Sequence, residues 1–292
     1  LKSITLDRLI NLFWGLVLLC LPVTTFNFFP SFFPSSQTRP MALYPLAILL
    51  LLILYRQIKE RDFRFPTVLI PLLAFLAAAF ASTVLGLQHT TVDVHGQSYI
   101  MRSIKGWLSA AIGLSFFYAA FMSVRSRVDL ERTLRWLFAG FLVCALVGVI
   151  QTIAIQTSFI KLGKVHNFLS VFIRQTSHGK RVSGLAFEPS WYADQLIMLY
   201  MPWLLSAVLF DLKLTGRKIL DWMLLLLLGA LLLFTYSRSG LLNAAMSVGL
   251  VSVFTLPLWW RRFFSEVKSF FTSGSPAILW AKRIGMILIC VV

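Results

Sequence analysis

Three charged residues in the second half of the sequence have the types and spacing to act on an anionic substrate. Arg181 and Glu188 lie in the stretch "RVSGLAFEPSWYADQL", and Arg238 lies in "FTYSRSG". The planar guanidinium of arginine donates a fork of hydrogen bonds that matches two phosphate oxygens, which suits a lipid-linked phosphate. A carboxylate can orient an arginine or act as a general base for a sugar hydroxyl. We therefore predict that Arg181, Arg238 and Glu188 carry the chemistry.

Each of these residues also has a structural interpretation. A single arginine at a membrane interface often extends its side chain to the lipid headgroups. In "EPS", Glu188 precedes Pro189, which suits the first position of a helix, where the helix dipole favours an acidic residue. Arg238 could join two helices as a polar clamp. The sequence leaves the functional and the structural interpretation open for each residue.

Further residues around these three are predicted to contact the substrate. The basic loop around Arg181 ends in "HGKRVSG". The last glycine of this motif, Gly184, allows a tight approach of the backbone. Asp194 lies about one turn inside the next apolar run. A carboxylate at that depth is costly unless it is paired or solvated. The predicted substrate contacts are Arg174, His178, Lys180, Gly184, Asp194 and Ser237.

The elements that position these residues are predicted to be membrane-spanning helices. Of the 292 residues, 58% are hydrophobic and 13% are charged, which is typical of an integral membrane protein. Apolar runs near the spanning length recur along the whole sequence, so we predict one all-α polytopic membrane domain over residues 1–292, with about nine spans. The first residue is Leu1 and the last run is short, so we expect a longer protein. The expected spans are 9–27, 41–55, 66–86, 104–122, 134–155, 191–210, 221–236, 240–258 and 284 onward.

The basic residues predict the orientation of the chain. The formal net charge is +16, but the positive charges lie in short loops between apolar runs, which indicates topology and no nucleic-acid partner. With the N-terminus in the cytoplasm, 18 of the 27 lysines and arginines lie on the cytoplasmic side. This bias predicts a cytoplasmic N-terminus and places Arg181, Glu188 and Arg238 on the exterior side.

The segment 156–190 is an exception to this charge rule. It holds five of the nine positive charges on the exterior side. Because positive charge in a short exterior loop opposes insertion, an anionic ligand would explain the cluster. Apolar residues recur at helical spacing within the segment, which predicts a short helix lying in the membrane interface. These apolar residues are Leu162, Val165, Leu169, Phe172 and Ile173.

Several kinds of site are not expected. The sequence has no Walker loop, dinucleotide-binding fingerprint, zinc-protease helix or nucleophile elbow. His89, Asp93 and His95 could imitate a metal site, but such spacing within one loop is common by chance. The three cysteines fall inside apolar runs, so neither a disulfide nor a thiolate metal site is predicted. We expect no metal and no cofactor.

The stretch "RVSGLAFEPSWYADQL", followed by "LLLLGALLLFTYSRSGLLNAAMSVGL", resembles the O-antigen ligase and polymerase family of bacterial surface-polysaccharide enzymes. Members have an arginine and a glycine before F-x-E/N-P at the start of one span, and SR-(G/S) at an exterior turn two spans later. The resemblance covers roughly residues 130–260. It implies a metal-independent glycosyltransferase of the C-type architecture in the bacterial cytoplasmic (inner) membrane. Its implied partners are a polyprenyl-pyrophosphate-linked glycan, an acceptor glycan, the lipid bilayer and polysaccharide-assembly proteins.

The resemblance also implies roles for individual residues. Arg181 and Arg238 would hold the pyrophosphate and stabilise the charge that develops on the leaving group. Glu188 in "EPS" is more similar to polymerases, because ligases often have asparagine before the proline. The family places a large exterior loop with a catalytic histidine or further arginines after the next spans, so the general base is expected beyond Val292.

Two other functions fit the same residues. In a transporter or flippase for an anionic or lipid-linked solute, the exterior arginines and Asp194 would line the solute's path. Such proteins often have paired repeats with broken helices, and the sequence shows no repeat. In a non-catalytic membrane scaffold, Arg181, Glu188 and Arg238 would be structural clamps.

Overall fold

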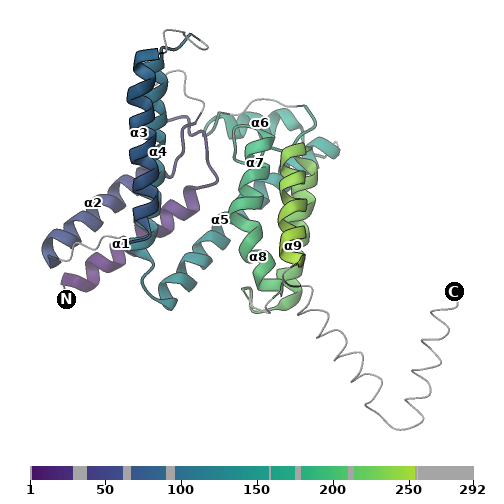
Figure 1. Ribbon diagram of the computed structural model, residues 1–292. Helices are drawn as coiled ribbons and strands as arrows, with labels where there is room; N and C mark the ends of the chain where they lie inside the picture. The colour runs from purple at the N-terminus through teal and green to yellow at the C-terminus, as the bar shows by residue number, and fades with distance from the viewer. Residues whose placement is uncertain are drawn as a thin grey trace. The chain divides into compact units, whose positions relative to one another are not determined.

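The computed structural model describes residues 2–28, 38–61, 67–89, 96–157, 159–174, 179–209, 214–253 and 255. The chain divides into two compact units, Leu1–Ser237 and Arg238–Val292. Every helix labelled in Figure 1 belongs to the first unit. In the second unit, residues 238–253 are helical. A single membrane domain over residues 1–292 stays a prediction.

The first unit is built from helices, and its described residues form no β-strand. Two isolated β-bridges join loops instead, Thr25 with Arg39 and Phe26 with Ile173. The prediction of an all-helical protein is therefore confirmed for the described residues. In chain order the helices are α1 (Lys2–Cys20), α2 (Leu43–Glu60), α3 (Leu69–His89), α4 (Tyr99–Ser123), α5 (Arg127–Gln156), α6 (Leu162–Ser170), α7 (Pro189–Gln195), the π-helical turn η1 (Leu196–Tyr200), α8 (Met201–Leu209) and α9 (Lys218–Phe234).

Four helical stretches are long and apolar enough to cross a membrane, namely Leu69–Leu87, Tyr99–Ser123, Arg127–Gln156 and Pro189–Leu209. These stretches overlap four of the predicted spans, so the membrane character is supported and the count of nine spans stays a prediction. The seventh predicted span corresponds to α9, which has 17 residues. The span predicted from residue 284 onward lies outside the described residues.

The first predicted span, 9–27, is wrong at its C-terminal end. Helix α1 ends at Cys20, and residues 22–28 leave the helix. Pro22 has no backbone N–H and cannot continue the helical hydrogen bonds. The backbone after it bonds to distant segments: the N–H of Phe26 donates to the carbonyl of Arg39 at 2.8 Å, and the N–H of Asn27 donates to that of Phe172 at 2.8 Å.

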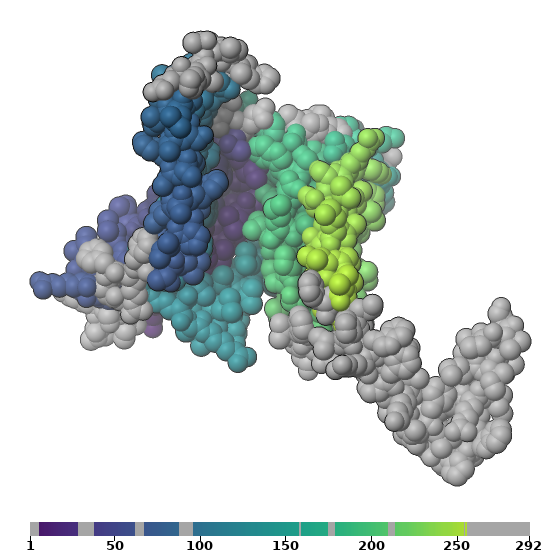
Figure 2. All heavy atoms as spheres, in the orientation of Figure 1, coloured from purple at the N-terminus to yellow at the C-terminus, as the bar shows by residue number. Residues whose placement is uncertain are grey.

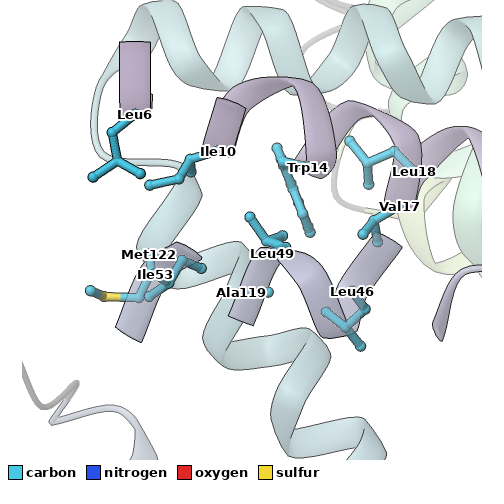
Figure 3. Packing of buried hydrophobic residues seen from close by; sticks show 10 residues of the cluster. All are labelled: Leu6, Ile10, Trp14, Val17, Leu18, Leu46, Leu49, Ile53, Ala119 and Met122. Atoms are coloured by element: carbon cyan, nitrogen blue, oxygen red, sulfur yellow. The ribbon is translucent and has the colours of Figure 1, made fainter. Parts of the chain in front are cut away.

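The core of the N-terminal half forms where α1, α2 and α4 meet. Figure 3 shows its apolar side chains pointing toward one another from these helices. Small residues bring α1 and α5 close together, because a side chain at Gly15 would overlap the ring of Trp136 and one at Gly140 would lie 3.2 Å from the carbonyl oxygen of Leu18. The core residues are Leu6, Ile10, Trp14, Val17, Leu18, Leu46, Leu49, Ile53, Ala119 and Met122.

One buried arginine joins three helices beside this core. Arg56 on α2 contacts the carboxylate of Asp7 on α1 at 3.3 Å and donates to the carbonyl of Met122 on α4 at 3.1 Å. Its side chain is only 7% exposed, whereas that of Asp7 is 58% exposed. A charge at this depth is tolerated because it is paired and hydrogen-bonded. Arg56 therefore fixes the ends of α1, α2 and α4 relative to one another.

Candidate functional site

The candidate site is built on a stretch of irregular backbone, residues 179–188, that enters α7. Residues 182–184 of this stretch are buried, and buried peptide groups must be hydrogen-bonded within the protein because water does not reach them. The side chain of Gln151 on α5 meets this need. Its Oε1 accepts the N–H groups of Ser183 at 3.1 Å and Gly184 at 2.8 Å, and its Nε2 donates to the carbonyl of Gly184 at 3.2 Å. Gln151 is buried, and its three hydrogen bonds clamp the segment at Ser183 and Gly184.

Two further bonds fix the segment at either side of this clamp. The N–H of Val182 donates to the carbonyl of Phe234, at the end of α9, at 3.0 Å. The N–H of Phe187 donates to the hydroxyl of Thr24, in the loop after α1, at 3.0 Å. The segment is thus held between α5, α9 and the loop at residues 22–28.

Arg181 is half-buried and lies against the C-terminal end of α9. Its Nε donates to the carbonyl of Thr235 at 2.9 Å. Thr235 is the C-cap residue of α9, where carbonyls lack helical partners and a positive charge is favoured. No acceptor for the two terminal nitrogens lies among the residues that the structure describes. One part of the guanidinium therefore fixes its orientation, and the other part can bind an anion.

Glu188 occupies the N-cap position of α7, and Pro189 is the first helical residue. This confirms the interpretation of "EPS" as the start of a helix. The Glu188 side chain makes no capping hydrogen bond. Its Oε1 instead accepts a hydrogen bond from the hydroxyl of Ser190 at 2.6 Å. The start of α7 therefore explains why a residue of this kind stands at position 188. The Glu188 carboxylate itself bonds to groups other than the free N–H groups of the helix.

Gly184 has a structural reason to be glycine. Its φ is +57°, in the left-handed region, and a Cβ would lie 2.5 Å from the ring of Tyr192. Tyr192 is fully buried, and its hydroxyl donates to the carbonyl of Cys144 at 3.3 Å. A side chain at Gly148 would overlap the same hydroxyl. The close approach predicted at Gly184 is therefore an approach to Tyr192, which packs between two glycines.

The other predicted substrate contacts are distributed more widely. Arg174 and Lys180 are exposed, and Asp194 is half-buried on α7. Within the described part of the chain, Asp194 has no hydrogen-bond partner and no ion pair. Ser237 is buried, and its N–H donates to the hydroxyl of Thr235 at 3.2 Å. Its backbone therefore belongs to the same turn that holds Arg181.

Two predicted site residues are not positioned relative to this segment. His178 lies outside the described residues. Arg238 is the first residue of the second unit and begins the helix at 238–253. The predicted break between two apolar helices is confirmed, since α9 ends at Phe234 and residues 235–237 are not helical. Tyr236 within this break has a φ of +48°.

The π-helical turn η1 divides the sixth predicted span. The N–H of Met201 donates to the carbonyl of Leu196, five residues earlier. Pro202 follows directly and has no N–H to donate, which explains the distortion. The indole N–H of Trp203 donates to the carbonyl of Leu199 at 2.6 Å. This bond gives a partner to one backbone carbonyl in the interrupted part of the helix. Such turns are frequent at functional sites, and Asp194 lies just before this one.

Sequence reasoning missed the residues that support the site. Gln151 lies inside a predicted span, and the presence of an amide in that apolar run was a signal, because polar groups inside a membrane are costly unless they are bonded. Thr24 had no such signal, because its partner Phe187 is 163 residues away. Gln195 was also missed, and its Nε2 donates to the carbonyl of Pro22 at 3.1 Å.

No protein-family model, no curated protein and no solved structure matches the chain. Among the described residues, no group of three or more His, Cys, Asp or Glu side chains could hold a metal ion. Asp93 and His95, which could imitate a metal site in the sequence, lie outside the described residues.

We expect the change Gly184→Ala to lower the free energy of unfolding by about 2–5 kcal/mol, since the left-handed backbone and the overlap with Tyr192 both oppose a Cβ. The measurement is thermal or denaturant unfolding of the purified protein in detergent. Gly216→Ala is the matched control. Gly216 has a φ of +77° but no atom within 4 Å of a Cβ, so only the backbone term of about 1–2 kcal/mol applies. Equal losses in both variants would contradict the packing role of Tyr192.

We expect the change Gln151→Leu to leave two N–H groups and one carbonyl of the segment without their partner, at a cost of about 1–3 kcal/mol for each group. Hydrogen exchange at Ser183 and Gly184 should accelerate more than exchange in α9. Gln151→Asn keeps the amide on a shorter side chain, so its effect should be smaller. Unchanged exchange in Gln151→Leu would show that other groups hold the segment.

Proposed function

We propose that the chain is a surface-polysaccharide polymerase or ligase of the bacterial cytoplasmic membrane. It transfers a polyprenyl-pyrophosphate-linked glycan to an acceptor glycan at the outer face, and its N-terminus lies in the cytoplasm. The resemblance of the Arg181 and Arg238 stretches to the O-antigen ligase and polymerase family supports this proposal. A C-type glycosyltransferase architecture with about nine spans belongs to the same proposal.

The observation that carries the proposal is the geometry of Arg181. Its Nε is bonded to Thr235 at 2.9 Å, so the plane of the guanidinium is fixed before any substrate binds. The terminal nitrogens then present two parallel donors, which match two oxygens of a pyrophosphate. A donor group that is fixed in advance stabilises developing charge better than a mobile one, because it does not reorganise during the reaction.

The proposed reaction uses the pyrophosphate as the leaving group. The bond between the anomeric carbon of the donor glycan and the pyrophosphate oxygen breaks, and its electron pair stays on that oxygen. A hydroxyl oxygen of the acceptor forms the new bond to the anomeric carbon, and its proton passes to a general base. Arg181 stabilises the negative charge on the departing pyrophosphate. Glu188 either orients a cationic group or serves as that base.

Substitution of Arg181 tests this role. We expect Arg181→Ala to reduce polymer formation by about 100-fold or more, as loss of a donor to a developing charge does. Arg181→Lys should also be impaired, because an ammonium cannot bond to Thr235 and also present a planar fork. The measurements are polymer length on gels and protein abundance on quantitative blots, in cells that lack their own copy of the gene.

The control is Arg127→Ala. The Arg127 side chain is 91% exposed and pairs with Glu131 on the surface of α5, so its loss should change neither abundance nor polymer length. Normal polymer in Arg181→Ala at normal abundance would contradict the proposal. Loss of abundance in that variant would support a structural clamp.

Arg238 needs a separate test, since its role rests on the sequence. For Arg238→Ala we expect normal abundance with loss of polymer, because a second guanidinium would share the pyrophosphate charge. The same gels and blots measure both quantities. Lost abundance would favour the clamp interpretation, and unchanged polymer would remove Arg238 from the proposed site.

A second candidate function is transport or flipping of an anionic or lipid-linked solute. The interrupted helix at η1 and the half-buried Asp194 before it favour this alternative, because broken helices and intramembrane carboxylates often mark solute paths. The two functions differ in a reconstituted assay. Purified protein in vesicles with a labelled lipid-linked oligosaccharide forms longer glycans if it is a transferase, and moves the label between leaflets without elongation if it is a flippase.

A further inference from the structure

Helices α3 and α4 enclose a groove that the proposed function does not use. The two helices lie side by side in Figure 1 and are joined near the end of α3 by a hydrogen bond from the Tyr99 hydroxyl to the Thr83 carbonyl at 3.1 Å. The cavity has a volume of about 280 Å³. Its walls include Phe75, Ala79 and Thr83 on α3 and Ser103, Gly106 and Trp107 on α4.

The groove is open because Gly106 lacks a side chain. A Cβ at Gly106 would meet no atom within 4 Å. The polar atoms of the walls bond to each other, since Trp107 Nε1 donates to Thr83 Oγ1 at 3.4 Å and Thr83 Oγ1 donates to the carbonyl of Ala79 at 2.8 Å. The hollow is therefore mainly apolar, and such walls suit a hydrocarbon chain.

One cation of α4 lies near the end of the groove that Thr83 and Tyr99 mark. Arg102 precedes Gly106 by one helical turn, and its guanidinium carbon lies 5.9 Å from the ring centroid of Tyr99. Its Nε is buried without a hydrogen-bond partner among the described residues. Lys105 is not among the residues that line the groove, and its Nζ donates to Gln97 Oε1 at 3.1 Å.

No acidic residue occurs in α3 or α4, so neither helix supplies a carboxylate for the positive charge of Arg102. A partly buried arginine near a membrane is costly unless an anion pairs with it. The groove therefore combines mainly apolar walls with a nearby positive charge, a pattern that suits an anionic lipid.

The exposed surface of α3 beside the groove is apolar. Figure 2 shows α3 as a continuous column on the visible face, in blue. Phe75 and Phe80 on this helix are 66% and 60% exposed. In a membrane such a surface contacts bulk lipid, so a phospholipid can enter the groove from the side.

We propose that the groove between α3 and α4 binds an anionic phospholipid, with an acyl chain along Gly106 and the phosphate at Arg102. The lipid supplies the counter-charge that the two helices lack and fills the space left by Gly106. This binding is independent of glycan transfer. It makes the bilayer lipid a component of the α3–α4 pair.

Native mass spectrometry of the purified full chain tests this site, with phosphatidylglycerol or phosphatidylcholine added to the detergent. We expect the wild type to retain phosphatidylglycerol in preference to phosphatidylcholine. Gly106→Leu should abolish this preference by filling the groove. Arg102→Gln should weaken retention about fivefold, the effect of one cation near a lipid headgroup.

Gly229→Leu is the control, because a Cβ at Gly229 on α9 also meets no atom within 4 Å. Thermal unfolding of both glycine variants shows whether they fold, and Gly106→Leu decides the outcome even if Arg102→Gln does not fold. Equal retention by Gly106→Leu and the wild type would overturn the proposal, as would equal retention of the two phospholipids. Displacement of phosphatidylglycerol by an equal amount of a polyprenyl diphosphate would show a different occupant and overturn it as well.

Discussion

The hydrogen bonds between Gln151 and the backbone of Ser183 and Gly184 are the interaction on which the candidate site depends. An irregular segment can lie among apolar helices only if its peptide groups find partners inside the protein. One amide side chain satisfies three of them, at 2.8 to 3.2 Å. Because α5 carries Gln151 within a long helix, the segment takes its position from a rigid element. Arg181 and Glu188 are then placed at the two ends of a clamped stretch.

The same segment is also tied to the N-terminal half of the chain. Thr24 accepts the N–H of Phe187, and Gln195 on α7 donates to the carbonyl of Pro22. The loop that holds Thr24 and Pro22 follows α1, which packs against α2, α4 and α5. Packing of the N-terminal core therefore sets where the first turn of α7 begins. The core residues do this although they are far from Glu188 in the sequence.

The sequence predicted the local features of this arrangement and not its long-range contacts. Pro189 at the first position of α7 and the break after Phe234 were predictable, because proline and the interruption of an apolar run act on neighbouring residues. The early end of α1 was missed, since the apolar pattern continues past Pro22. The clamp by Gln151 was not predicted either, because hydrophobic periodicity identifies a span but not the partner of a polar residue inside it.

The structural and the functional interpretation of Arg181 are therefore compatible. A free arginine loses conformational entropy when it binds an anion, and that loss weakens the complex. The bond from Nε to Thr235 restricts the side chain in the free protein, so less freedom remains to be lost when an anion binds. The hydrogen bond made by Nε of Arg181 is structural, and it also orients the two terminal nitrogens for binding an anion. The carbonyls at the end of α9, which need a donor in any case, provide the anchor.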